Sequence, residues 1–303
     1  MNLISVGDLT PEGLRDLLAL AGKVKTEPAA FRTRLGGRSV GLFFAKQSLR
    51  TWVSCDVATA QLGGHPLSIS DTAIGLGSRE APADVGRVLE RYVDLLAMRV
   101  HRHRDLTDIA QHVTMPMVNL LSDHEHPCQA VADLQTIASH RPLAGAVVTY
   151  VGDGNNVCHS LMLGATMTGA SVRVASPPGY RPDPSVIEAA RAHGDVEIFS
   201  EPEAAVEGCD VVYTDVWTSM GQEEEAEVRR RIFAPYQVTA GLFDRAKAGA
   251  IFMHCLPAHR GEEVTDEVME HKRSVVFDQA ENRLHAFKAV LLTLLDDNAR
   301  PEA

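Results

Sequence analysis

The sequence lacks any apolar run long enough to cross a membrane. A helical span needs roughly 20 consecutive apolar residues, and no stretch of the 303 residues approaches that length. The first eight residues, MNLISVGD, also lack the basic start and apolar centre of a secretory signal. These two absences predict a cytoplasmic protein.

Positive charge is scarce as well. The chain has 29 Lys and Arg against 40 Asp and Glu, which gives a formal net charge of -11. Nucleic acids and anionic membranes require a basic surface, so neither is the expected main partner. The partner that we expect is a small molecule, and an anionic one needs a local group of arginines.

Paired cysteines are absent. The five cysteines are odd in number, and none belongs to a CxxC motif; they are Cys55, Cys128, Cys158, Cys209 and Cys255. This pattern indicates neither a disulfide framework nor a zinc ribbon. A metal held by His254, Cys255 and His259 is not favoured either, because their spacing fits no common zinc pattern and no further carboxylate or cysteine partner is evident nearby. We therefore predict no metal.

A dinucleotide fingerprint is incomplete. The motif Gly152-Asp153-Gly154-Asn155-Asn156-Val157 has valine where the third glycine should allow close helix packing. A nicotinamide dehydrogenase is thus a weaker interpretation. No cofactor is expected.

What the sequence does contain is an alternation of helix and strand signals, typical of an α/β protein with mainly parallel sheets. Thr10 and Pro11 are suited to begin a first helix. The predicted strands are 39–44, 67–70, 94–98, 115–119, 146–151, 171–175, 196–200, 210–214, 250–255 and 274–277. The predicted later helices are 51–62, 82–92, 106–112, 127–138, 157–167, 184–192, 241–247 and 280–295, and 223–225 is expected as a solvated loop. We expect two domains, 1–132 and 133–279, with a C-terminal helix in 280–303 returning to the first.

Polar clusters follow several predicted strands, where ligands of parallel sheets bind. The first is Ser48-Leu49-Arg50-Thr51, at the start of a predicted helix. Outward-pointing amides, the helix dipole and a guanidinium fork suit a phosphate. A helix cap beside an unrelated surface arginine is the alternative.

Together these clusters resemble the successive signatures of the ornithine carbamoyltransferase family. The matching segments are Ser48 to Thr51, Arg99, His126-Pro127-Cys128-Gln129, Asp215 with Ser219-Met220-Gly221, and His254-Cys255-Leu256-Pro257-Ala258-His259-Arg260-Gly261. The first and third parts are shared with aspartate carbamoyltransferases. Ser219-Met220-Gly221 and His254-Cys255-Leu256-Pro257 select the ornithine branch.

The resemblance implies transfer of the carbamoyl group of carbamoyl phosphate to the δ-amine of ornithine, without a cofactor, by a homotrimer or a multiple of trimers. It assigns carbamoyl phosphate to Ser48, Leu49, Arg50, Thr51, Arg99, His126, Gln129, Cys255, Leu256 and Arg283. It assigns ornithine to Asn156, Asp215, Ser219 and Met220. Arg99, His126, Asp215 and Cys255 would be catalytic, and either Cys255 or Asp215 could assist removal of the amine proton.

Some positions depart from the family pattern. Trp52 and Asp56 replace an Arg and Glu that would pair on a helix face, and Trp52 would instead shape the pocket beside the phosphate. Gly75 replaces a glutamine that reaches a neighbouring subunit, while Leu49 and Ala45 replace a threonine and an acidic residue. Another amine acceptor, such as lysine, putrescine or an acylated ornithine, and a ligand-binding protein without turnover therefore stay as alternatives.

Overall fold

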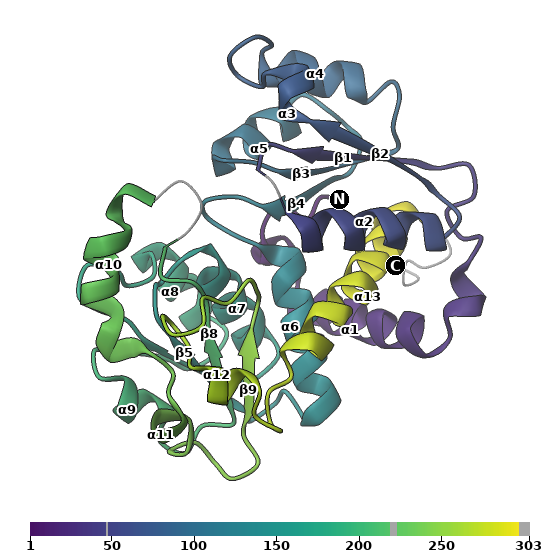
Figure 1. Cartoon of the computed structure of the whole chain (residues 1–303). Helices are drawn as coiled ribbons and strands as arrows, with labels where there is room; N and C mark the ends of the chain where they lie inside the picture. Colours follow the sequence, from purple (N-terminus) through teal and green to yellow (C-terminus); the bar gives the residue numbers. More distant parts are fainter. Residues whose placement is uncertain (47, 219–222, 297–303) are drawn as a thin grey trace. The chain divides into compact units, whose positions relative to one another are not determined.

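The chain folds into two compact α/β units in a computed structural model that describes residues 1–46, 48–218 and 223–296. Unit 1 comprises Met1–Gln135 and the C-terminal segment from Glu281, and unit 2 comprises Thr136–Ala280. Each unit contains one parallel sheet with helices around it (Figure 1). This agrees with the fold class predicted from the sequence, including the return of the last helix to the first unit.

The sheet of unit 1 has the strand order β2-β1-β3-β4. Its strands are β1 (Ser39–Phe44), β2 (His65–Ser70), β3 (Leu95–Arg99) and β4 (Met117–Leu121). Its helices are α1 (Pro11–Thr26), α2 (Leu49–Gln61), α3 (Asp71–Ile74), α4 (Pro82–Leu89), α5 (His103–Ala110), the first part of α6 (Pro127–His140) and most of α13 (Val276–Leu295), with the short 3-10 helices η1 (Val6–Asp8) and η2 (Pro28–Phe31). Every residue of β3 is buried, which is why its sequence is an unbroken apolar run before Arg99.

Strand order places the functional end of this sheet. The chain runs from β1 to the β2 edge and then crosses to β3 and β4 on the other side. Phe44 and Arg99 are paired in register, so β1 and β3 end side by side. The loops after two such neighbouring strands run in opposite directions, and the gap between these loops, at the carboxyl ends of the strands, is where ligands of parallel sheets bind. Ser48 and Arg99 both lie at that end of the sheet.

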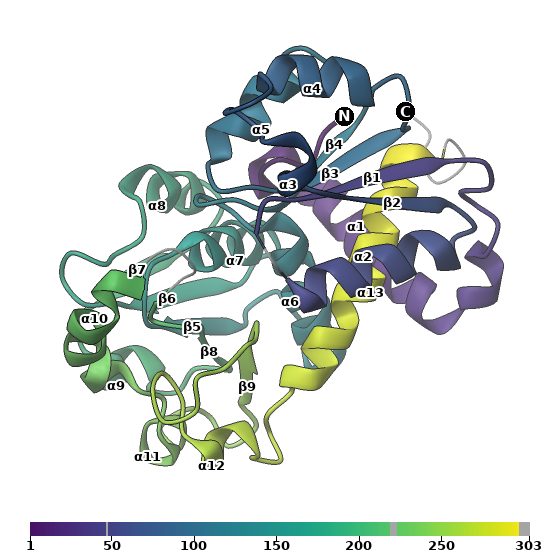
Figure 2. The same ribbon diagram turned by 45° about the horizontal axis from the view of Figure 1, so that its top comes forward.

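The sheet of unit 2 has the order β7-β6-β5-β8-β9. Its strands are β5 (Val147–Val151), β6 (Ser171–Ala175), β7 (Val196–Phe199), β8 (Val211–Thr214) and β9 (Ile251–His254). Its helices are α7 (Asn156–Met167), α8 (Pro184–Arg191), α9 (Pro202–Val206), α10 (Ala226–Phe233), α11 (Ala240–Phe243) and α12 (Asp266–Met269), with η3 (Glu223–Glu225) and η4 (Ala234–Tyr236). The corresponding switch in chain direction falls between β5 and β8, and Figure 2 shows these strands in the middle of the unit.

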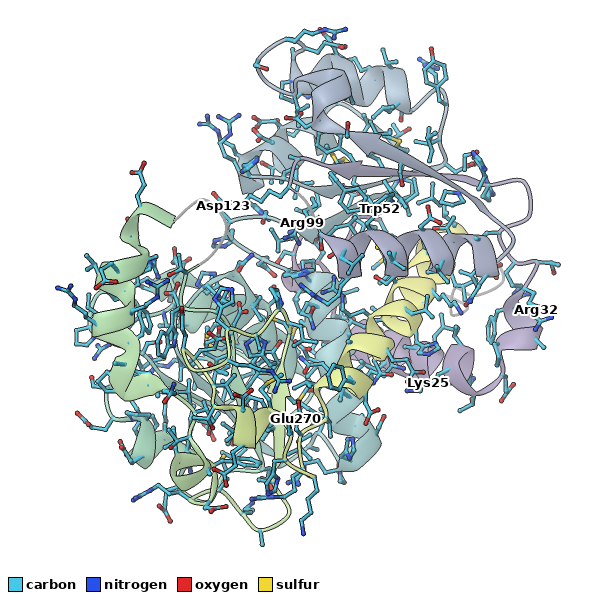
Figure 3. All side chains as sticks on the ribbon, viewed as in Figure 1. Lys25, Arg32, Trp52, Arg99, Asp123 and Glu270 are labelled. Carbon is cyan, nitrogen blue, oxygen red and sulfur yellow. The ribbon has the colours of Figure 1, made fainter. Side chains whose placement is uncertain are left out.

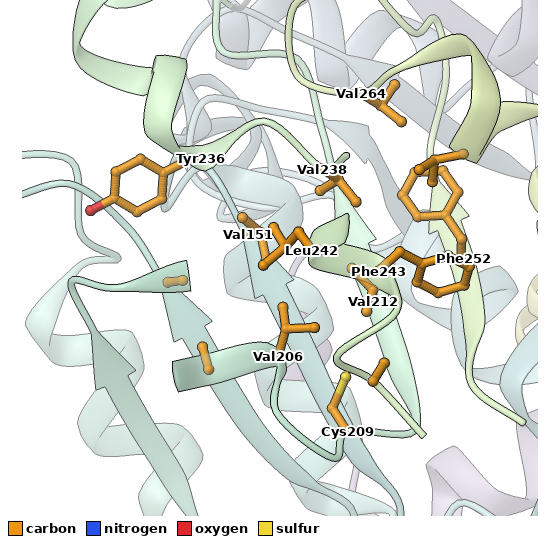
Figure 4. Packing of buried hydrophobic residues seen from close by; sticks show 14 of the residues in the cluster. Val151, Val206, Cys209, Val212, Tyr236, Val238, Leu242, Phe243, Phe252 and Val264 are labelled. Carbon is orange, nitrogen blue, oxygen red and sulfur yellow. The ribbon is translucent and has the colours of Figure 1, made fainter. Parts of the chain in front are cut away.

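One face of this second sheet is covered by an apolar cluster that Figure 4 shows in detail. Val212 of β8 and Phe252 of β9 pack there with Val238 and Phe243, all at most 1% exposed. Burial of large side chains contributes about 1.5–3 kcal/mol each relative to exposure. This cluster keeps β8 and β9 adjacent, and thereby fixes the loops that follow them.

The strand predicted over 274–277 is wrong. Ser274 makes an isolated bridge to Phe252 and Val275 N donates to Phe252 O (3.0 Å), but α13 already begins at Val276. The β-branched and aromatic residues favour a strand locally, whereas the chain leaves the sheet edge after one bridge and Gln279 N donates to Val275 O. The prediction of a loop at 223–225 is wrong as well, because these residues form a short 3-10 helix. The short helices α9, α10 and α12 were not predicted.

Several local predictions are confirmed. The Thr10 side chain accepts a hydrogen bond from Gly13 N at the start of α1, and α5 overlaps the predicted helix 106–112 but begins three residues earlier, at His103. All five cysteines are buried free thiols. In the described part of the chain, no helix has both the length and the apolar character needed to cross a membrane.

Candidate active site

The turn from β1 into α2 forms the first polar cluster. Ser48 is the N-cap of α2, and its hydroxyl accepts a hydrogen bond from Thr51 N (3.3 Å) and donates one to Thr51 Oγ1 (2.8 Å). Leu49 is 72% exposed, so only its backbone amide is suited to contact an anion, and Arg50 follows it in the first helical turn. The helix end and the two hydroxyls give the cluster several donors.

Arg283 of α13 ties this turn to α6. Its Nη1 donates to Gln129 Oε1 (2.7 Å) and its Nη2 donates to Thr51 Oγ1. Gln129 Nε2 in turn donates to Asp133 Oδ1 (2.8 Å). Thr51, Gln129 and Arg283 are all at most 8% exposed. The structure therefore brings together three predicted residues, of which the two most distant, Thr51 and Arg283, are 232 positions apart in the sequence.

Arg99 and His126 complete the polar residues of unit 1 that were predicted. Arg99 is the last residue of β3, and His126 directly precedes α6; both are buried. Burial lowers the pKa of His126 well below its usual value, and the positive charges of Arg283 and then Arg99 lower it further. The imidazole is therefore neutral at pH 7. A neutral ring can donate a hydrogen bond without adding a positive charge to those of Arg50, Arg99 and Arg283.

A second cluster lies in unit 2 at the ends of β8 and β9. Cys255 Sγ donates to Asp215 Oδ1 (2.9 Å), and Asn155 Nδ2 donates to Asp215 Oδ2 (2.8 Å). Asp215 and Cys255 are buried. The predicted neighbourhood of Asp215 and Cys255 is therefore present, with a proton of the thiol directed at the carboxylate. The Asp215 carboxylate can accept a proton from a nearby amine directly, whereas the Cys255 thiol can do so only after its own proton has passed to Asp215.

Asn155 was not singled out from the sequence. Its side chain caps α7 by accepting from Val157 N (3.0 Å) and Cys158 N (3.1 Å), and its Oδ1 also accepts from the Tyr150 hydroxyl (3.2 Å). The capping position before a predicted helix was a usable signal. Asn156, which was predicted, is the first residue of α7, while Ser219 and Met220 lie outside the described residues.

The segment after β9 is held by a buried His254–Glu263 pair. His254 Nε2 lies 3.0 Å from Glu263 Oε1, and His254 Nδ1 accepts from Leu256 N (2.8 Å). Nδ1 is thus an acceptor and Nε2 carries the proton. Leu256 has a φ of 58°, a left-handed conformation that costs a leucine about 1–2 kcal/mol, and the bond to His254 helps to hold it.

Glu263 corrects the expectation that no carboxylate lies near His254 and His259. Its Oε1 also accepts from His259 N (2.6 Å). Asp215, His254 and Cys255 have ligand atoms within 4.8 Å of one another, as do His259, Glu262 and Glu263. Both ring nitrogens of His254 already make hydrogen bonds, so a metal at the first group would have to break one of them.

Asp153 is a further group that sequence reasoning missed. It follows β5 and its Oδ2 pairs with Arg229 Nη1 at 2.9 Å. Burial raises the pKa of Asp153 to about 6, although Arg229 opposes the rise. Its partner comes from α10, a helix that was not predicted, which is why the pair gave no signal in the sequence.

Two departures from the family pattern have distinct structural settings. Trp52 is 51% exposed, and its Nε1 donates to Ser68 Oγ of β2 (2.9 Å); Figure 3 labels it on α2. Gly75 ends α3 with a φ of 66°, and a Cβ there would lie 3.0 Å from Arg79 Cβ. A glutamine at 75 would therefore be strained in this backbone.

Family models match both parts of the chain. Residues 1–139 match the carbamoyl-P binding domain of aspartate/ornithine carbamoyltransferase, and residues 144–294 match its Asp/Orn binding domain. The chain belongs to the aspartate/ornithine carbamoyltransferase family.

Individual members of this family are similar to the chain over nearly its whole length. The ornithine carbamoyltransferase of Pyrococcus horikoshii is 49% identical over 302 residues, covering 97% of this chain and 95% of that protein. The solved ornithine carbamoyltransferase of Pyrococcus furiosus is 49% identical, with a TM-score of 0.92 and coverage of 97% and 96%. A solved N-acetyl-L-ornithine transcarbamylase is 26% identical, with a TM-score of 0.88 and coverage of 97% and 100%. The fold is thus common to enzymes named for different acceptors, whereas identity is higher to those named for ornithine.

Proposed function

We propose that the protein transfers the carbamoyl group of carbamoyl phosphate to the δ-amine of L-ornithine, giving L-citrulline and phosphate. The observation that carries the proposal is the 49% identity, over nearly the whole chain, to proteins named ornithine carbamoyltransferase. The similar Pyrococcus furiosus protein is named as an anabolic enzyme, so we place the reaction in arginine biosynthesis.

Unit 1 provides the groups that a carbamoyl phosphate dianion needs. In the proposal, the α2 amides, Ser48, Arg50 and Thr51 bind the phosphate, and Arg99 lies between the phosphate and the carbonyl. Arg283 fixes Thr51 and Gln129 by direct hydrogen bonds. The phosphate site is then ordered before the substrate arrives, which reduces the entropy lost on binding.

His126 is the donor that we assign to the carbonyl oxygen. Its lowered pKa keeps the ring neutral, so it can donate an N–H as the oxygen becomes negative in the tetrahedral intermediate. A donor of this kind is worth about 3–4 kcal/mol in other acyl-transfer enzymes. Gln129 orients the carbamoyl group, and Leu256 adds a backbone contact that His254 holds in place.

Unit 2 provides the acceptor side. Attack needs an unprotonated δ-amine, and Asp215 with Cys255 can take a proton from it. The short Cys255–Asp215 contact lets the pair share that proton. Asn155 holds the other oxygen of Asp215. Asn156 binds the α-carboxylate, while Ser219 and Met220 are assigned to ornithine from the sequence alone.

An amine panel tests the proposal. Purified protein is mixed with carbamoyl phosphate and ornithine, lysine, putrescine or N-acetylornithine, and ureido product and phosphate are measured separately. We expect equal amounts of citrulline and phosphate with ornithine, and much slower turnover with the others. Arg99→Leu should abolish turnover, whereas Arg104→Leu, which removes an exposed charge, should not. No citrulline at millimolar substrate would refute the proposal.

The cytoplasmic location and the homotrimer predicted from the sequence are also part of this proposal. Sedimentation of the full chain should give the mass of three chains or a multiple of three, each of 32.8 kDa. A monomer that turns over at full rate would remove the trimer from the proposal and leave the reaction intact.

A further inference from the structure

A depression of about 630 Å³ lies in unit 1, away from the Ser48 turn. Its walls come from the end of α1, η2, the end of α2 and one side of α13. Figures 1 and 2 both show α13 beside α1 and α2, and Figure 3 labels Lys25 and Arg32 at this place. We call it the Lys288 pocket, after the most buried of its charged residues, which are Lys25, Arg32, Glu281, His285 and Lys288.

The pocket is basic in a chain that is strongly acidic. It holds three basic side chains, those of Lys25, Arg32 and Lys288, and one carboxylate, that of Glu281. That carboxylate is already engaged, because Lys25 Nζ lies 3.3 Å from its Oε2 and His285 Nε2 lies 3.1 Å from its Oε1. Two positive charges, those of Arg32 and Lys288, therefore have no carboxylate partner among the residues that the structure describes.

The deeper part of the pocket contains polar groups that a protein ordinarily pairs. Lys288 is 3% exposed, and its Nζ donates only to the neutral amide oxygen of Gln61 within the described chain. His285 is 7% exposed, and its Nδ1 is buried without a hydrogen-bond partner there. Burial lowers the pKa of Lys288 and that of His285. A buried cation without a counter-charge is costly, and a bound anion would offset the cost.

We propose that the Lys288 pocket is a second anion site, which binds a small molecule carrying a phosphate group. Two uncompensated cations match the double charge of a phosphate better than the single charge of a carboxylate. Arg32 offers a fork of donors and Lys288 a point charge, a combination suited to phosphate oxygens. The volume exceeds that of phosphate itself and falls in the range of small-molecule sites, while Pro28 and Leu284 provide an apolar wall for an organic part.

The pocket is built on the same two helices as the proposed carbamoyl phosphate cluster. Arg283 of α13 contacts Thr51 at the start of α2, and Lys288 of α13 contacts Gln61 at the end of α2. A ligand that draws Lys288 and Arg32 together therefore acts on the α2–α13 packing that positions Arg283. Any resulting change in carbamoyl phosphate affinity is reciprocal between the two sites, and this consequence rests on the proposed function.

Calorimetry on the full chain tests the site without relying on turnover. Pyrophosphate is titrated into protein saturated with a non-hydrolysable phosphonate analogue of carbamoyl phosphate, so that the Ser48 cluster is filled. The double variant Arg32→Gln/Lys288→Met removes the two uncompensated charges. The matched control Arg15→Gln/Lys23→Met removes two exposed charges from α1. Inorganic phosphate and citrate serve as further probes of size and charge type.

We expect pyrophosphate to bind wild-type protein and the control variant alike. Loss of two charge-assisted contacts should weaken binding to the double variant about hundredfold. Arg50→Ala should leave pyrophosphate binding intact and weaken the carbamoyl phosphate analogue instead. This crossed pattern would support a second site whether or not the protein makes citrulline, so failure of the proposed function is seen separately.

Three results would overturn the proposal. Pyrophosphate binding that disappears when the analogue is saturating would mean that it had entered the Ser48 cluster. Equal losses in the double and control variants would mean general charge attraction. A change in sedimentation mass of the double variant, without any pyrophosphate binding, would mean that these cations pair with a second copy of the chain.

Discussion

Replacing Arg283 by methionine should separate the organisation of the phosphate cluster from the stability of the fold. The substitution keeps an unbranched chain of similar length and removes the guanidinium. It deletes the hydrogen bonds to Gln129 Oε1 (2.7 Å) and Thr51 Oγ1. Hydrogen bonds from a charged donor are worth about 1.5–3 kcal/mol each, so the two lost bonds amount to about 3–6 kcal/mol.

Part of this energy returns, because methionine avoids the cost of burying a cation that is 8% exposed. We therefore expect the free energy of unfolding to fall by about 2 kcal/mol. Carbamoyl phosphate should bind about a hundredfold more weakly, because the site loses the Arg283 cation and the hydrogen bonds that orient Thr51 and Gln129. Chemical unfolding and calorimetry with the phosphonate analogue measure the two effects independently.

The same variant has a second signature in its pH dependence. Arg283 is the larger of the two charges that lower the pKa of His126, after burial itself. Removing Arg283 makes protonation of the ring easier and raises this pKa. Because the neutral ring is the proposed active form, activity on the acid side should be lost at a higher pH than in the wild type. An unchanged acid limb would contradict the assigned role of His126.

Arg34→Met is the matched control. Arg34 also fixes α13, through an ion pair with Asp296 (2.9 Å), but it lies outside the proposed site. If Arg34→Met weakens the analogue as strongly as Arg283→Met, loosening of the helix explains the effect. A folded Arg283→Met protein with analogue affinity within threefold of wild type would refute our account of the cluster.

Two further perturbations concern unit 2. Burial raises the pKa of Asp153 from a usual 3.8 to about 6 in the folded protein, so the stability of the fold falls as pH rises between these values and the full cost applies above pH 6. Asp153→Asn should therefore raise the free energy of unfolding by about 3 kcal/mol at pH 7, a figure that already includes the pairing with Arg229, and should leave it unchanged near pH 3. Thermal unfolding from pH 3 to 8 would show this, and a stability difference independent of pH would contradict it. Cys255→Ala should lower kcat by about tenfold to a hundredfold with little change in analogue affinity. Asp215→Asn should lower kcat further, because Asp215 makes contacts through both oxygens. Steady-state kinetics with ornithine measure both effects, and equal losses of kcat in the two variants would mean that the thiol is the essential group.

Much of the candidate site could be predicted because its residues belong to short local motifs. Ser48 to Thr51 caps a helix directly after a strand, and that arrangement depends on neighbouring residues alone. Asp215 and Cys255 follow strands that the structure shows to be adjacent, β8 and β9, and their closeness was implied by the family resemblance, because the sequence pattern does not give strand order. The resemblance to the carbamoyltransferase family used the same contiguous segments.

The residues that escaped prediction depend on distant partners. Glu263 reaches His254 from a loop, Arg229 reaches Asp153 from a charged short helix, and Asn155 contacts Asp215 across the switch in the sheet. The predicted strand at 274–277 failed for a similar reason, since its local propensity was outweighed by the start of α13.

The sequence by itself determined the α/β class, the helix cap at Ser48 and the family to which the chain belongs, because these depend on local pattern and contiguous motifs. The tertiary structure decided that Arg283 joins Thr51 to Gln129, that the His126 ring is neutral, and that Arg32 and Lys288 share one pocket. Burial and charge separation are set by residues far apart in the chain, and only folding brings those residues together.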